Sequence, residues 1–229
     1  MTQSIRTFVE AARAVARVVE AVPPDAWDGP GLGDWTVRDL VGHTSRALIT
    51  VVDYLARPVA AEVIESAAAY LVAVSGGTVD AQTVAERGRQ AGRDLGESPA
   101  TRFGQLSGEA IQAAEVTDPD LVVHTVFGGM RVATYLQTRT FELCVHGLDI
   151  ACSAEVPIAL PPAALEATCR LAATTAVRLG RGGGRADGAH RPARATPALQ
   201  HLLGRPVPPG YQLSACAWGG CVGVGVVNA

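Results

Sequence analysis

Lysine is absent from the 229-residue sequence, so all 19 basic side chains are arginines. They are outnumbered by 22 acidic residues, and the formal net charge is −3 at pH 7. A chain without a positive field offers little to nucleic acid or to an anionic membrane surface, and we expect neither as a partner. Aromatic residues are also scarce, at 5%, whereas apolar residues reach 48%. This balance favours helices packed through small side chains over an aromatic-rich β fold, and it predicts a mainly α protein.

Long apolar runs and paired cysteines are missing as well. No uninterrupted apolar segment approaches the roughly 18 residues needed to cross a bilayer. The first apolar segment, residues 4–22, is interspersed with charges and is typical of an amphipathic helix, not of a secretory leader. The five cysteines form no CxxC pair, which argues against a disulfide framework and a structural zinc knuckle. We expect a reduced cytoplasmic protein in which Cys144 and Cys169 are buried packing residues.

Apolar residues recur with the helical period over most of the chain. A long helix is predicted to begin at Thr36, whose hydroxyl can cap the backbone near Asp39, and to end before Pro58. Residues 80–95 and 99–115 are predicted to be helical pieces interrupted near 96–99, and we interpret the whole region as one bundle helix with an irregular lead-in. A short extended segment is predicted at 121–126. Its histidine, His124, is either near the cavity or a loop histidine bonded to a partner, and we favour the second interpretation. The other predicted helices cover residues 4–22, 61–74, 135–151 and 162–180.

The composition changes in the last third of the chain. Residues 181–194 contain many glycines and arginines and almost no apolar side chain, which predicts a mobile loop. These glycines lack the strand-to-helix context of a phosphate-binding loop, so a nucleotide site is not indicated. Two apolar stretches at 211–217 and 221–227, joined by a Gly-Gly turn, predict a hairpin. We therefore divide the chain into a helical bundle, residues 1–152, and a small α+β domain, residues 153–229.

The predicted helix at 135–151 carries a polar stripe. Its ionisable side chains recur at spacings of four, three, four and three residues, which places them above one another on one helix face. The other sides are apolar, so the helix is expected to be packed nearly all round and the stripe to line an internal cavity. The alternative is an exposed stripe whose members pair with one another. The stripe consists of Tyr135, Arg139, Glu142, His146 and Asp149.

Glu142 and His146 are four residues apart, so a carboxylate and an imidazole can converge on one ion. Such pairs are common on exposed helices, and a metal site needs a further ligand. His43, at the edge of the apolar face of the second predicted helix, is a natural third ligand, although histidines there are ordinarily hydrogen-bonded core residues. This donor set suits zinc or another divalent metal and leaves coordination positions open. Arg139 and Tyr135 would then contact an anionic substrate or support the ligands.

Two segments, DWTVRDLVGHTSRAL at 34–48 and RTFELCVHGLDIA at 139–151, together resemble the mycothiol-dependent maleylpyruvate isomerase family. This family is a branch of the DinB-like metal-binding bundles, and the resemblance covers the first two-thirds of the chain well. It implies a DinB-like four-helix bundle followed by a small α+β C-terminal domain that helps to form the active-site cleft. It also implies a divalent ion, with zinc expected, that is held by His43, Glu142 and His146.

The function implied by the resemblance is activation of a low-molecular-weight thiol, mycothiol, for attack on a small electrophilic and anionic substrate. An isomerase and an S-transferase both fit, and Arg205 is the basic residue of the C-terminal part that would serve the site. The absence of lysine fits an actinobacterial source, where mycothiol is available. The alternative function is a non-catalytic metal- or small-ligand-binding protein of the same fold, whereas a purely structural bundle would require the stripe at 135–151 to be exposed. We expect a monomer or a homodimer.

Overall fold

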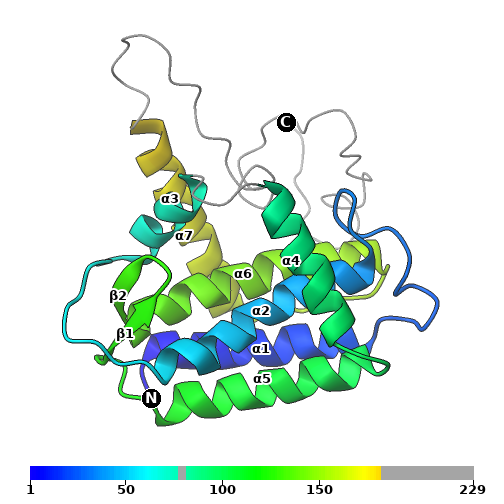
Figure 1. The fold of residues 1–229 in the computed structure, drawn as a ribbon, viewed down its shortest axis with the longest axis horizontal. Helices are drawn as coiled ribbons and strands as arrows, with labels where there is room; N and C mark the ends of the chain where they lie inside the picture. Colours follow the sequence, from blue (N-terminus) through cyan, green and yellow to red (C-terminus); the bar gives the residue numbers. More distant parts are fainter. Residues whose placement is uncertain (77–80, 182–229) are drawn as a thin grey trace, which may run out of the picture.

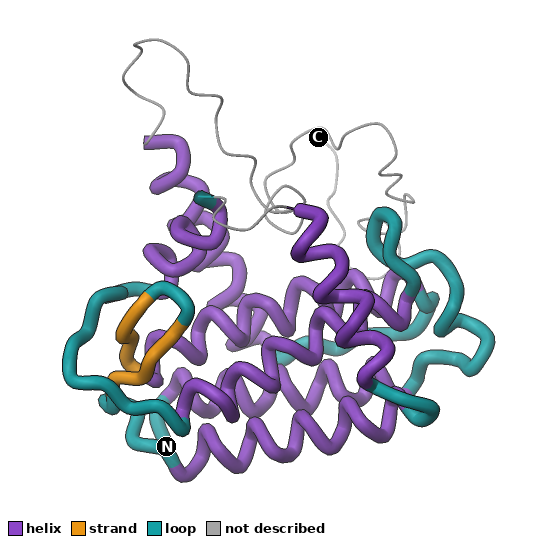
Figure 2. The backbone as a smooth tube through the Cα atoms, in the orientation of Figure 1, coloured by secondary structure: helices purple, strands orange, loops and turns teal. Residues whose placement is uncertain are grey.

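The computed structural model of the protein describes residues 1–76 and 81–181. Four long helices run alongside one another and form a bundle (Figure 1 and Figure 2). In this bundle α1 lies against α5 and α6, and α2 lies against the same two helices. The mainly α fold predicted from the sequence is therefore confirmed. The bundle helices are α1 (Gln3–Glu20), α2 (Val37–Leu55), α5 (Pro99–Val116) and α6 (Val132–Ser153).

Apolar stripes facing the bundle interior hold these helices together. On α1 the side chains of Phe8, Val15 and Val19 are fully buried, at the spacing that puts them on one helix face. The start of α2 is fixed by the predicted capping box: the Thr36 hydroxyl accepts from the Asp39 amide at 3.2 Å, and the Asp39 carboxylate accepts from the Thr36 amide at 3.1 Å. The capping box therefore fixes the residue at which α2 begins.

A shorter helix, α4 (Ala81–Asp94), crosses α2 (Figure 1). The two backbones approach closely because glycines meet at the crossing: a Cβ atom on Gly42 would lie 2.1 Å from the backbone nitrogen of Gly92. A further glycine, Gly88, leaves room for the indole ring of Trp35, which a Cβ atom there would approach to 2.7 Å. The helical pieces predicted at 80–95 and 99–115 are confirmed as α4 and α5. The interpretation of the first piece as an irregular lead-in is wrong, because its glycines permit close packing and do not break the helix.

The helix predicted at 61–74 begins later, as α3 (Ala67–Ser75). The residues before it form no helix, and their backbone bonds to another segment: the amides of Val63 and Ile64 both donate to the carbonyl of Gly129, at 2.8 and 2.9 Å. These amides are therefore unavailable for helical hydrogen bonds. The alanine-rich composition alone gave no sign of this tertiary pairing.

A short antiparallel hairpin, formed by β1 (Val122–Thr125) and β2 (Gly128–Arg131), leads directly into α6. The extended segment predicted at 121–126 is thus confirmed. His124 lies within β1, not in a loop, and is exposed.

The helix predicted at 162–180 is confirmed as α7 (Pro162–Arg181), which packs against α6 and α3. It exposes Cys169, so the prediction that this cysteine is buried is wrong: its side chain lies on the face of α7 that no other described helix covers. Cys144 is buried, as predicted. Within the two described ranges, no helix is both long enough and apolar enough to cross a membrane.

Most of the predicted α+β domain lies beyond the described residues. This applies to nearly all of the glycine-rich loop at 181–194, to the hairpin strands at 211–217 and 221–227, and to Arg205. The division at residue 152 therefore stays a prediction.

Candidate metal centre

Two histidines and a glutamate meet in the interior between α2 and α6. His43 comes from α2, whereas Glu142 and His146 come from successive turns of α6. One possible donor atom from each residue lies within 4.8 Å of the other two. The imidazole rings of His43 and His146 meet edge to face, with 4.9 Å between their centroids. The structure thus brings together the three residues that the sequence singled out.

Hydrogen bonds on both ring nitrogens fix the imidazole of His146. Its Nε2 lies 3.2 Å from Glu142 Oε2, and its Nδ1 lies 3.2 Å from Asp149 Oδ2. Burial lowers the pKa of His146, but the hydrogen bonds to Asp149 and Glu142 outweigh burial and raise the pKa to about 10. Burial raises the pKa of Glu142, and the hydrogen bond and charge of His146 outweigh it and lower the pKa to about 2. Both shifts favour positive charge next to the Glu142 carboxylate, so this position is suited to a cation.

His43 has a buried nitrogen without a partner. Its Nδ1 forms no hydrogen bond with any residue that the structure describes. Leaving such a group unpaired costs roughly 1–3 kcal/mol. Burial, aided by the charge of His146, lowers the pKa of His43 to about 3, so the imidazole is neutral and retains a lone pair. Two imidazoles and a carboxylate, one of them with an unsatisfied nitrogen, are a donor set that fits a divalent ion such as zinc.

One side of His43 is covered by an indole ring. The centroid of Trp35 lies 4.8 Å from that of His43, and its N–H donates to the carbonyl of Ala85 on α4 at 3.2 Å. Because Gly88 leaves space for this ring, α4 and the loop before α2 together cover the imidazole on this side.

Arg139 and Tyr135, predicted as substrate or supporting residues, lie on the same face of α6. The guanidinium of Arg139 lies over the rings of Tyr135 and Tyr70, at 5.1 and 5.5 Å from their centroids. Tyr135 is fully buried, and its hydroxyl donates to Thr50 Oγ1 at 2.8 Å. Burial raises the pKa of Tyr135, so this phenol stays protonated.

Three side chains at the centre were not predicted as site residues. Asp149 belongs to the polar stripe, and its spacing of three residues after His146 could have indicated the hydrogen bond between them. Trp35 lies in the loop before α2, outside the helical patterns that indicated the candidate ligands. Tyr70 belongs to α3, which carries no polar pattern that would have pointed to the site.

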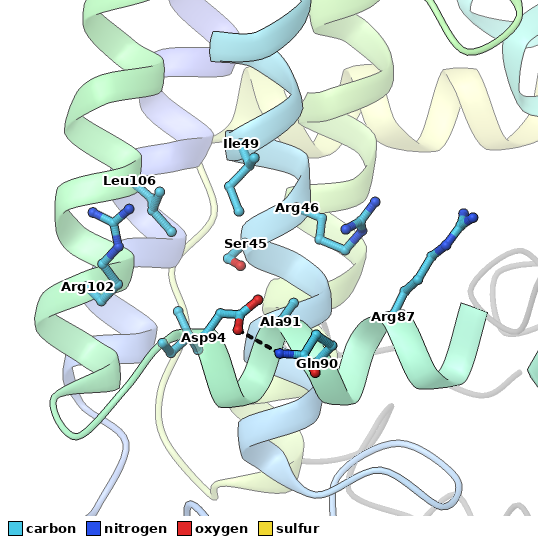
Figure 3. Close-up of a pocket in the computed structure, with 10 residues that line it drawn as sticks. Ser45, Arg46, Ile49, Arg87, Gln90, Ala91, Asp94, Arg102 and Leu106 are labelled. Carbon is cyan, nitrogen blue, oxygen red and sulfur yellow. Dashed lines mark hydrogen bonds between the residues drawn. The ribbon is translucent and has the colours of Figure 1, made fainter. Parts of the chain in front are cut away.

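A separate cavity of about 190 Å³ lies between α2, α4 and α5 (Figure 3). Arg46 and Arg87 extend on one side of it and Arg102 lies on the other, while Asp94 accepts a hydrogen bond from Gln90 at 2.7 Å. None of the three candidate metal ligands lines this cavity.

Replacing Asp149 with alanine is expected to weaken metal binding about 10- to 100-fold, because the imidazole of His146 would lose the group that orients it. The affinity can be measured by competition with a metal-sensitive dye. Asp53→Ala is the matched control, since Asp53 is an exposed aspartate on α2. Equal affinities for wild type and Asp149→Ala would contradict this role.

The geometry of the bundle agrees with a comparison against known families. No curated protein and no solved structure matches the chain. A family model does match residues 8–151, which is more than half of the chain and includes all three candidate ligands. Its description is the mycothiol maleylpyruvate isomerase N-terminal domain. The chain therefore belongs to the mycothiol maleylpyruvate isomerase family.

Proposed function

We propose that this protein is a divalent-metal-dependent enzyme that activates mycothiol for attack on a small, electrophilic and anionic substrate. The observation that carries the proposal is the convergence of a ring nitrogen of His43 with Glu142 and His146, at a histidine whose buried Nδ1 has no hydrogen-bond partner among the described residues. Membership of the family supports mycothiol as the thiol. An isomerase adds and then eliminates the thiol, whereas an S-transferase leaves a thioether, and the proposal covers both reactions.

His43, Glu142 and His146 would hold the ion, for which we expect zinc. When bound, such an ion lowers the pKa of a coordinated thiol and so favours the reactive thiolate at neutral pH. Three protein donors leave a coordination position for this thiol. Asp149 holds the His146 ring through Nδ1 so that Nε2 points toward Glu142 and the shared site.

Three further side chains near the candidate ligands provide positive charge, exclude water or support the wall of the site. Arg139 lies one helical turn before Glu142 and provides a permanent positive charge for an anionic substrate. Trp35 covers His43 and keeps water from that side of the ligand. Tyr135, buried and bonded to Thr50, supports the wall of the site.

The proposal is tested with cobalt-substituted protein, because Co²⁺ reports its ligands through visible absorption. Mycothiol is expected to change this spectrum and to support turnover of electrophiles from a panel of unsaturated carboxylic acids. Glu142→Gln should reduce thiol-dependent turnover by at least about tenfold, since it raises the charge at the ion by one unit and alters how firmly the thiolate is held.

A protein that only stores or senses metal would give a different result. It would bind cobalt through the same residues, but mycothiol would neither alter the spectrum nor support turnover of any electrophile in the panel. That outcome would overturn the enzymatic proposal in favour of the non-catalytic metal-binding function.

A further inference from the structure

The cavity between α2, α4 and α5 contains positive charge that its own lining does not neutralise (Figure 3). Its volume is about 190 Å³, and none of the three candidate metal ligands lines it. Three of its ten lining residues are arginines, whereas only one, Asp94, is acidic. The Asp94 carboxylate already accepts a hydrogen bond from Gln90 at 2.7 Å. The lining therefore has an excess of positive charge.

Two of the three arginines have no partner within the described part of the chain. Arg46 on α2 is half-buried and Arg87 on α4 is exposed, and neither forms a hydrogen bond or an ion pair with a described residue. The third, Arg102 on α5, pairs with Glu109 of its own helix at 3.5 Å. Figure 3 shows Arg46 and Arg87 extending on the same side of the cavity, although they belong to different helices. An anion on this side can accept hydrogen bonds from both helices.

Apolar side chains form the inner wall of the cavity. Leu95 and Leu106 are at most 6% exposed, and Ala91 is 7% exposed. An apolar cavity of about 150 Å³ is enough to hold benzene, so this cavity has room for a single ring or a short branched chain. Its hydroxyl group is already used, because Ser45 donates to the carbonyl of Gly42 at 2.7 Å. A matching ligand therefore has an apolar group and an anionic head that meets the guanidinium groups.

Two separate guanidinium groups match a phosphate head better than a carboxylate. A carboxylate has two oxygens in one plane, and a single guanidinium fork already occupies both. A phosphate monoester has three terminal oxygens around the phosphorus atom, so it can accept from two arginines that approach from different helices. It also carries about two negative charges at neutral pH, which balance the two unpaired cations.

We propose that this cavity binds a small phosphate monoester, with its apolar group against Leu95 and Leu106 and its phosphate between Arg46 and Arg87. Such a ligand would join α2 to α4, because it accepts hydrogen bonds from one arginine of each helix. The site is separate from the candidate metal centre, and the proposal does not rest on the thiol chemistry proposed above.

The test measures binding of phenyl phosphate to the full-length protein by calorimetry. Inorganic phosphate and phenol serve as probes for the two halves of this ligand. Phenyl phosphate is expected to bind at least about tenfold more tightly than either, because it combines burial of a ring with hydrogen bonds to charged groups. The measurement is repeated after the metal has been removed with a chelator. Binding in the cavity should persist, whereas an ester held by the ion would be released.

Variants of the charged residues test the phosphate position. Arg46→Gln and Arg87→Gln are each expected to weaken binding of phenyl phosphate about tenfold and to leave binding of phenol unchanged. Asp94→Asn removes the negative charge from the lining and should strengthen binding of the ester several-fold. Arg89→Gln is the control, because Arg89 is an arginine of α4 that pairs with Glu86 and does not line the cavity. It should bind the ester within about twofold of wild type.

A variant of the apolar wall tests the position of the ring. Ile49 lines the cavity, and Ile49→Phe adds a ring there. This variant should bind phenyl phosphate no more tightly than inorganic phosphate, because the space for the phenyl group is filled. If Ile49→Phe folds poorly, Arg87→Gln still tests the site, since Arg87 is exposed and its replacement removes no packing in the core.

Three results would overturn the proposal. The first is that phenyl phosphate binds the metal-free protein no more tightly than phenol does. The second is that Arg46→Gln and Arg87→Gln both bind the ester as wild type does. The third is that Arg89→Gln weakens binding as much as Arg87→Gln, since the effect would then be one of net charge. None of these results changes the proposed function, which the cobalt spectrum and turnover with mycothiol decide.

Discussion

His43→Ala is expected to abolish stable binding of a divalent ion, as is His146→Ala. Each variant removes one of three donors whose atoms lie within 4.8 Å of one another, and two donors cannot hold the ion against water. Because changes to groups behind the ligands already cost about 10- to 100-fold in affinity, loss of a ligand should exceed a hundredfold. Elemental analysis of the purified proteins measures the effect directly. Equal metal content in wild type and both variants would remove the basis of the proposed centre.

The stability of the protein supplies a second measure of the same effect. An ion at a thousand times its dissociation constant should stabilise the wild-type fold by about 4 kcal/mol, and neither variant should show this gain. His124→Ala is the matched control, because His124 is exposed on β1 and belongs to no donor cluster formed by the described residues. It should retain both the metal and the metal-dependent rise in melting temperature.

The two histidine variants are also expected to differ in stability when no metal is bound. Without an ion, His43 contributes a buried nitrogen that has no partner, so its removal need not destabilise the metal-free protein through lost hydrogen bonds. His146 is different, since its removal leaves Glu142 without the hydrogen bond that lowers the carboxyl pKa. His146→Ala is therefore expected to lower the stability of the metal-free protein more than His43→Ala does.

The sequence pattern was sufficient to indicate the three candidate ligands, because helical spacing is a local property. Glu142 and His146 share a face of α6 by their four-residue separation alone, and the helical period places His43 at the edge of the apolar face of α2. Their meeting across the bundle then follows from packing two apolar faces against each other. The family motifs pointed to the same residues.

The parts that could not be predicted depend on contacts between distant segments. Tyr70 reaches Arg139 only because α3 starts late, and this start is set by amides at Val63 and Ile64 that donate to Gly129. The sequence of residues 61–74 alone cannot reveal these hydrogen bonds, because their acceptor, Gly129, lies in a distant segment. The crossing of α2 by α4 is a similar case, because glycines that lower helix propensity in a single segment become favourable when another backbone needs their space.

Gly42→Ala is expected to destabilise the protein by about 1–3 kcal/mol, the usual cost of forcing extra atoms into a packed interior. A Cβ atom at this position would lie 2.1 Å from the backbone nitrogen of Gly92, so α2 and α4 would have to separate. The contact is with backbone, which cannot move aside by changing a rotamer. Chemical denaturation measures the change in the free energy of unfolding.

Gly108→Ala provides the matched control, since Gly108 is also a helical glycine but its Cβ atom would meet no heavy atom within 4 Å. This substitution should stabilise the protein by about 0.5–1 kcal/mol through the higher helix propensity of alanine. The two identical chemical changes are therefore expected to have opposite signs. If both stabilised the protein, the close crossing of α2 and α4 would be refuted. Because Gly42 directly precedes His43 and α4 holds Trp35 against that ring, Gly42→Ala should also weaken metal binding, while Gly108→Ala should leave it unchanged.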